Sequence, residues 1–180
     1  MEKMTSFGIR ELHIAKYDEA LSTYEAFKKL DGVQSLNVEP ITSKYDLEGD
    51  DTIIETRSVL EGYTFSFENG VLDFEGLSIM EGSELTDIMD TDGTTKIGEE
   101  LRNNSEDEKP YFALIGRVVG SKELKVILPM AKAESVNQSY QTKNYAIVSV
   151  SGTAIKNANG DMRILRTDGK PITDEDLTSL

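Results

Sequence analysis

The residues best suited to chemistry in this sequence lie in one acidic segment. YDLEGDD, residues 45–51, places four carboxylates within six positions, at Asp46, Glu48, Asp50 and Asp51. Such a cluster can bind a divalent cation through several oxygens, or provide an acid and a base for sugar hydrolysis. Its spacing fits no calcium loop, and the chain has no tryptophan with which to stack a sugar. We therefore predict no metal ligand and no catalytic residue here.

A second acidic segment, IMDTDGTTKIGE, spans residues 88–99. Aligned with a calcium loop of the EF-hand type, Asp90, Asp92, Gly93 and Glu99 fall at the third, fifth, sixth and twelfth positions. The first position, which requires a carboxylate, is Ile88, and the flanking residues do not form two amphipathic helix patterns. The pattern therefore favours an acidic loop with an Asp-Gly turn over a calcium site.

Nucleophilic and cofactor chemistry find little support. His13 is the only histidine, it lies within a strand pattern, and the chain has no cysteine. The nucleophile motif G-x-S-x-G and both glycine-rich phosphate loops are missing from the sequence. We expect His13 to be a strand residue without a catalytic role, and we predict a protein that is not an enzyme and uses no cofactor.

The charge and length restrict the possible partners. The 180 residues fit one domain, and 33 acidic residues against 19 basic ones give a net charge of −14. Tight binding to nucleic acid rests mainly on lysine and arginine, so a conventional DNA-binding domain is disfavoured. No stretch approaches the roughly 18 apolar residues of a membrane span. We expect no membrane anchor and synthesis in the cytoplasm.

The elements that must position these residues are mainly strands. Apolar residues alternate with polar ones in the segments 7–17, 61–70, 110–120, 122–130 and 145–155. Strand patterns also flank the acidic segment, in VQSLNVEPI before it and TIIETRSV after it. Helical patterns are limited to residues 71–82 and 95–104. The pattern predicts a mainly β chain, an antiparallel β-sandwich or barrel with one short flanking helix.

The order of these segments resembles a known family. FGIRELHIAKY and SLNVEP near the start, and PYFALIGRVVG and YAIVSVSGTAI later, are similar to the major tail proteins of long, non-contractile-tailed bacteriophages. The resemblance covers most of residues 7–168, and residues 71–109 match least. It implies a tail-tube β-sandwich domain at 1–168, with an extended loop at about 41–51. Residues 169–180 are then a short acidic tail, which we expect to be frayed.

The resemblance also implies a function. Subunits of this family form hexameric rings that stack into a hollow tube, which conducts DNA and encloses the tape-measure protein. The partners would be further copies of the chain, the tape-measure protein and the terminator and tip proteins. DNA would pass through the lumen without specific binding. The expected location is the virion tail, assembled in the cytoplasm of the host bacterium.

Related subunits carry a hairpin arm that reaches the next ring, and the acidic segment is its natural counterpart here. The arm would comprise the residues Tyr45, Asp46, Leu47, Glu48, Asp50 and Asp51. Basic residues of a neighbouring subunit are candidate partners, namely Lys28, Lys29, Lys122 and Lys125. Two variants of the function remain open, the tube of a phage-derived bacteriocin particle and a type VI-like secretion tube. A β-sandwich that binds a surface is the alternative from a different functional class, that of binding modules.

Overall fold

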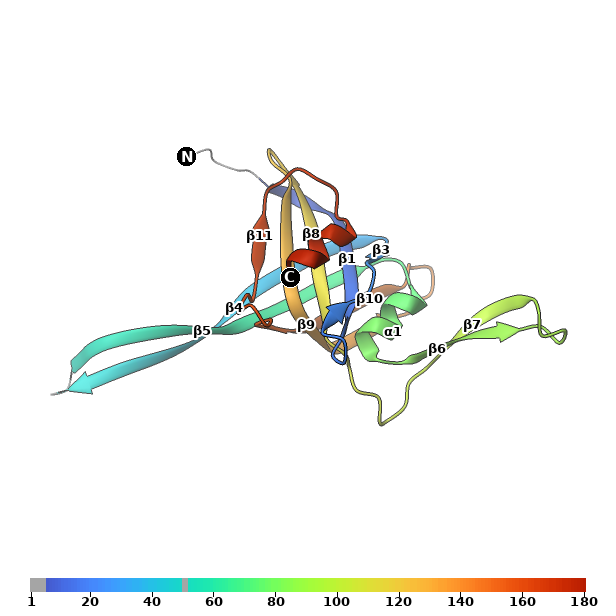
Figure 1. Cartoon of the computed structure of the whole chain (residues 1–180), viewed down its shortest axis with the longest axis horizontal. Helices are drawn as coiled ribbons and strands as arrows, with labels where there is room; N and C mark the ends of the chain where they lie inside the picture. Colours follow the sequence, from blue (N-terminus) through green and yellow to red (C-terminus); the bar gives the residue numbers. More distant parts are fainter. Residues whose placement is uncertain (1–5, 50–51) are drawn as a thin grey trace.

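The computed structural model describes residues 6–49 and 52–180, and its chain is mainly β. Two antiparallel sheets, one of nine strands and one of two, are accompanied by one short α-helix (Figure 1). The strands are β1 (Ser6–Asp18), β2 (Thr23–Tyr24), β3 (Lys28–Leu30), β4 (Val33–Gly49), β5 (Thr52–Asn69), β6 (Glu84–Met89), β7 (Lys96–Arg102), β8 (Phe112–Gly120), β9 (Leu124–Ser139), β10 (Ile147–Ile155) and β11 (Ile164–Arg166). The helices are α1 (Phe74–Glu81) and the 3₁₀ helix η1 (Asp174–Ser179).

The large sheet has the order β2-β1-β8-β9-β10-β5-β4, with β3 paired to β1 and β11 paired to β9. Register shifts interrupt the β1–β8, β8–β9, β9–β10 and β4–β5 ladders, and such bulges bend strands. The sheet curves so far that Leu36 of β4 lies against Gly116 of β8, where a Cβ would meet it at 2.5 Å. The mainly antiparallel β prediction is confirmed, but the described strands form no closed barrel.

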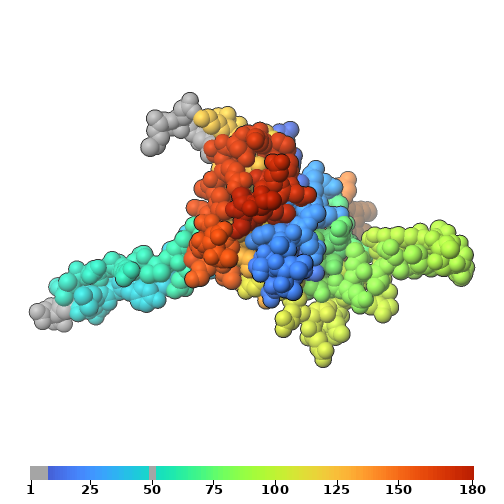
Figure 2. Space-filling model, in the orientation of Figure 1, coloured from blue at the N-terminus to red at the C-terminus, as the bar shows by residue number. Residues whose placement is uncertain are grey.

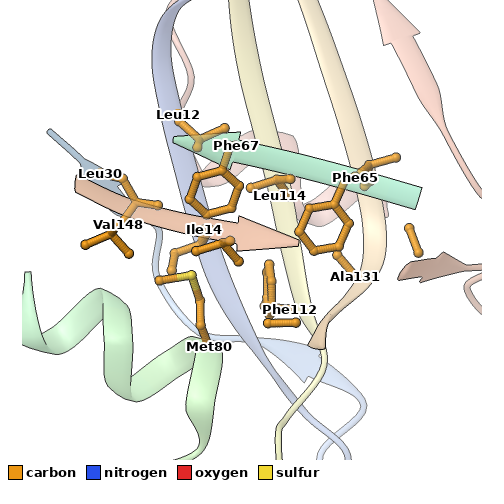
Figure 3. Packing of buried hydrophobic residues seen from close by; sticks show 14 of the residues in the cluster. Leu12, Ile14, Leu30, Phe65, Phe67, Met80, Phe112, Leu114, Ala131 and Val148 are labelled. Atoms are coloured by element: carbon orange, nitrogen blue, oxygen red, sulfur yellow. The ribbon is translucent and has the colours of Figure 1, made fainter. Parts of the chain in front are cut away.

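The core lies on the concave side of this curved sheet (Figure 3). The alternation in β5 places Tyr63, Phe65 and Phe67 in the core, while the residues between them face solvent. Phe112 of β8 meets Phe65 edge-on, with ring centroids 6.1 Å apart. Apolar side chains at every second position therefore fix which face of each strand is buried. The buried members of this core are Leu12, Ile14, Leu30, Tyr63, Phe65, Phe67, Leu77, Met80, Phe112, Leu114, Leu128, Ala131, Ala133, Val148, Val150 and Ala154.

The helix α1 covers the core through Leu77 and Met80. Its N-terminus is capped by the carboxylate of Asp73, which accepts a hydrogen bond from the backbone N–H of Glu75. Gly82 ends the helix in the left-handed conformation, with φ of 74°. The helix predicted within residues 71–82 is thus confirmed. The one predicted at 95–104 is wrong, because most of this segment forms β7, paired with β6.

The opposite face of the sheet has a small core of its own. Ile115 of β8 and Ile127 of β9 pack against Ile172, and Leu180 lies beside them. Residues 172–180 therefore fold back over the sheet, which corrects the expectation of a frayed C-terminal tail. An ion pair fastens this segment, since the amine of Lys125 lies 2.9 Å from the carboxylate of Asp176 and both side chains are buried.

Candidate functional site: a projecting hairpin

The outer part of the β4–β5 hairpin projects from the body as a ribbon of two strands (Figure 1). The two strands pair from Val33 and Asn69 to Gly49 and Thr52. The neighbouring strand β10 pairs with β5 only from Tyr63 to Asn69, so the described sheet supports only the inner part. We call residues 42–49 and 52–60 the arm, because a register shift after residue 41 marks where the ribbon leaves the body.

The extended loop predicted at about 41–51 is wrong for the residues that the structure describes. Residues 41–49 are strand rather than loop, and they pair with the first half of β5. The second half of the arm, residues 52–60, comes from the strand predicted at TIIETRSV and carries no acidic cluster to mark it. Its residues Glu55, Arg57 and Val59 complete the ribbon. Asp50 and Asp51, also assigned to the arm, lie outside the described residues.

One face of the arm carries a hydrogen-bonded polar cluster, beside the exposed Leu60 that lies opposite Thr42. The carboxylate of Asp46 accepts a hydrogen bond of 2.7 Å from the hydroxyl of Thr56 on the facing strand, and one of 2.9 Å from the amine of Lys44. The bond from Lys44, followed by that from Thr56, lowers the pKa of Asp46 below its ordinary value. Asp46 therefore uses its oxygens to join the two strands rather than to bind a metal.

The other face of the arm is apolar and unsupported. Directly opposed residues of an antiparallel pair share a face, so Tyr45 lies with Arg57, Leu47 with Glu55, and Ser43 with Val59. The exposed fraction is 58% for Tyr45 and 57% for Leu47, and Val59 is also exposed. The space-filling view shows the arm standing clear of the body (Figure 2). This face combines large apolar side chains with one cation and one anion, as protein interfaces often do.

Packing at the base holds the arm where it leaves the sheet. Gly62 lies so close to β10 that a Cβ would meet the carbonyl oxygen of Ala154 at 2.7 Å. The guanidinium of Arg163 lies over the ring of Tyr63, 4.6 Å from its centroid, an arrangement that favours cation–π attraction. The arm therefore leaves a tightly packed base, although its outer part rests on no other described strand.

The four candidate partner lysines occupy different environments. Lys28 pairs with Glu75 and Asp73. The hydrogen bond to Glu75 is the largest cause of the raised pKa of Lys28. Lys29 forms an exposed pair with Asp31. Lys122 lies in the turn between β8 and β9, as shown by the bounds of those strands. Lys125 is buried and its amine contacts the carboxylates of Asp176 and Asp168. An incoming arm would have to displace the C-terminal segment to reach Lys125.

A second, shorter hairpin is formed by β6 and β7 on the other side of the body from the arm (Figure 1). It contains the Asp-Gly turn expected at residues 92–93, and Gly93 adopts a left-handed φ of 69°. The carboxylate of Asp92 accepts hydrogen bonds from the backbone N–H groups of Thr94 and Thr95, which lower its pKa. These bonds within the turn account for the acidic pattern. Among the described residues, no cluster of three or more His, Asp or Glu side chains could hold a metal.

His13 occupies β1 on the outer face of the sheet. Its ring meets Phe27 edge-on at 5.9 Å, and its Nε2 lies 3.7 Å from the carboxylate of Glu11. Burial lowers the pKa of His13, against the opposing effect of Glu11. No helix in the described part of the chain is long and apolar enough to span a membrane.

Comparison with protein-family models finds none that matches this chain. Comparison with curated proteins finds no match either.

Proposed function

We propose that this protein is the tube subunit of a bacteriophage tail, built to form hexameric rings that stack into a hollow tube. The observation that carries the proposal is the position of the arm. The family resemblance places an inter-ring hairpin between SLNVEP and TIIET, and the chain has a projecting ribbon in that place. On this proposal the large curved sheet is a tail-tube fold, and the arm is its contact with the next ring.

The arm supports an assembling subunit on physical grounds. A two-stranded hairpin is only marginally stable in water without a further strand or packing partner. The arm exposes the large apolar side chains of Tyr45, Leu47 and Ile54 instead of burying them. In addition, β4 is the last strand at its end of the sheet, and a free strand edge favours pairing with another chain. Association with further copies would cover both features.

The charge of the subunit suits a channel for DNA. With a net charge of −14, the surface repels phosphates, so that DNA slides past instead of binding. We expect no retention of duplex DNA by the purified protein, even at low ionic strength, where electrostatic attraction is strongest. Tight, salt-sensitive binding of duplex DNA in a mobility-shift assay would count against a passive channel.

Electron microscopy of the purified protein at increasing concentration tests the proposal. Rings or tubes with a central channel are expected, because the same surfaces must meet in every copy. A protein that stays monomeric at every concentration and binds a glycan array would instead be a surface-binding module. Whether a tube belongs to a phage, a bacteriocin particle or a secretion system is decided by the genes beside its own.

A further inference from the structure

A cleft of about 540 Å³ lies at the far end of the body from the arm. It is bounded by β3, by the segment that joins β5 to α1, and by β7. Val71, Leu72 and Phe74 form its apolar part, and Val71 and Leu72 are exposed. When a partner covers exposed apolar side chains in a cleft, the free energy of the system falls, so such a surface favours binding.

Charged side chains of both signs line the rim of this cleft. Lys28 and Lys29 are its cations, and Asp31, Asp73 and Glu99 are its anions. Lys29 pairs with Asp31 at 3.3 Å, and both side chains are more than half exposed. Exposed pairs of this kind contribute little to stability, so they can exchange partners on binding at small cost.

The apolar face of the arm has matching properties. Tyr45, Leu47 and Val59 supply apolar surface, and Glu55 and Arg57 lie on the same face, two residues apart. Lys29 and Asp31 on the cleft rim are also two residues apart. One relative orientation therefore places Glu55 against Lys29 and Arg57 against Asp31, while the apolar side chains meet. The opposite orientation would bring like charges together, so the charges select a direction.

The geometry excludes this contact within one chain. The cleft begins two residues after the end of β5, whose other end, Thr52, belongs to the tip of the arm. The 18 residues of β5 separate the two by roughly 55 Å at about 3.3 Å per residue. The arm also points away from the cleft (Figure 1). Only the arm of another copy can reach this cleft.

We propose that the cleft formed by Val71, Leu72 and Phe74 receives the apolar face of the arm from a second copy of this chain. This inference rests on the proposed function, because it assigns the receiving surface for the arm. The contact is heterologous, since it joins two different surfaces at opposite ends of the subunit. A pair joined in this way still has one free arm and one free cleft, so the contact propagates as a closed ring or a filament.

Disulfide trapping tests the contact directly, because the chain has no native cysteine. Leu47→Cys protein and Leu72→Cys protein are mixed at the highest soluble concentration and oxidised, then analysed on a denaturing gel without reductant. A covalent dimer is expected in the mixture, and a ladder of multimers is expected from the chain that carries both substitutions. The matched control pairs Leu47→Cys with Ser151→Cys, which is exposed on β10. This control should give no dimer above background.

A charge exchange tests the predicted orientation. Glu55→Lys should lower the yield of the Leu47→Cys/Leu72→Cys dimer roughly fivefold, the size expected for one exposed charge pair, and Lys29→Glu should restore it. Absence of the Leu47–Leu72 dimer, or equal trapping in the Ser151 control, overturns the contact. Microscopy of the untreated protein separates the two claims. Tubes without the dimer overturn only this contact, whereas the dimer without tubes supports the contact and counts against the proposed function.

Discussion

The hydroxyl of Thr56 donates a hydrogen bond of 2.7 Å to the carboxylate of Asp46 across the two strands of the projecting arm. Through this bond, one carboxylate of the acidic segment joins the two strands of the hairpin. Asp46 ties β4 to β5 on one face, and the opposite face is left to Tyr45 and Leu47. The arm thus presents Tyr45 and Leu47 on the face opposite this bond, where a partner can cover them.

Removing the arm should block assembly and leave the body folded. The change replaces residues 44–58 with Asn-Gly, so that Ser43 and Val59, which face one another, are joined by a tight turn. We expect an unchanged unfolding transition and a monomer at every concentration in sedimentation velocity, because the core contains no arm residue. Full-length tubes from this variant would refute the assignment of the arm.

Changing a single face of the arm gives a sharper version of that test. Leu47→Asp places a charge on the apolar face and should abolish rings and tubes. Thr42→Asp adds the same charge to the opposite face, which carries Asp46 and Leu60, and assembly should persist. The critical concentration for assembly, measured by light scattering, compares the two variants. Equal inhibition by both substitutions would show that total charge, rather than the apolar face, controls assembly.

The aromatic residues of β5 should dominate the stability of the body. Phe67 is 1% exposed, and Phe67→Ala should lower the free energy of unfolding by about 3–5 kcal/mol through lost burial and a residual cavity. The neighbouring Glu68 faces solvent, and Glu68→Ala should change the free energy by no more than about 0.5 kcal/mol. Urea titrations of both variants measure the difference. Similar values would mean that the alternation assigns the wrong face to the core.

The buried ion pair beneath the C-terminal segment should be costly to break. Lys125→Met leaves the carboxylate of Asp168 without its lysine and that of Asp176 with Arg166 alone, and the expected loss is about 3 kcal/mol, the lower end for breaking a buried pair. Lys96→Met removes an exposed lysine that also contacts two carboxylates, and the loss should stay below about 1 kcal/mol. Thermal unfolding of both variants provides the comparison. A small effect of Lys125→Met would mean that the segment is held by Ile172 and Leu180 instead.

Stability should depend on pH through His13. Burial lowers the pKa of His13 in the folded state below its value of about 6.5 in the unfolded chain, so the unfolded state binds the proton first. The stability is therefore fully present above about pH 6.5 and is lost as the pH falls toward the folded pKa. His13→Gln should flatten the dependence of urea midpoints between pH 7 and pH 5. An unchanged slope would assign the effect to other groups.

Much of the fold follows from local pattern. Alternation in β10 and in the inner half of β5, together with the Asp-capped helix α1, carries its structure in neighbouring residues. β7 does not, because Glu99, Glu100 and Leu101 favour helix, while pairing with β6 imposes a strand. The segment predicted as an extended loop is strand up to Gly49, in keeping with the alternation of Tyr45 and Leu47 with charged residues.

The prediction of a frayed C-terminal segment is wrong for a related reason. Its acidic composition is typical of a frayed end, but Ile172, Asp176 and Leu180 are spaced four apart and meet the sheet together. Two cations make Asp176 favourable in a buried place, namely Arg166, ten positions earlier in the chain, and Lys125, 51 positions earlier. No local pattern reports such a distant pair. The same limit applies to the cleft beside Val71, which is assembled from three separate segments.

Cryo-electron microscopy of the concentrated protein shows whether this chain builds a tube. We expect hollow tubes made of stacked rings with six subunits each, in which density for the arm bridges from one ring to the next. Solid fibres, closed dimers, or rings whose arms stay within their own subunit would contradict it.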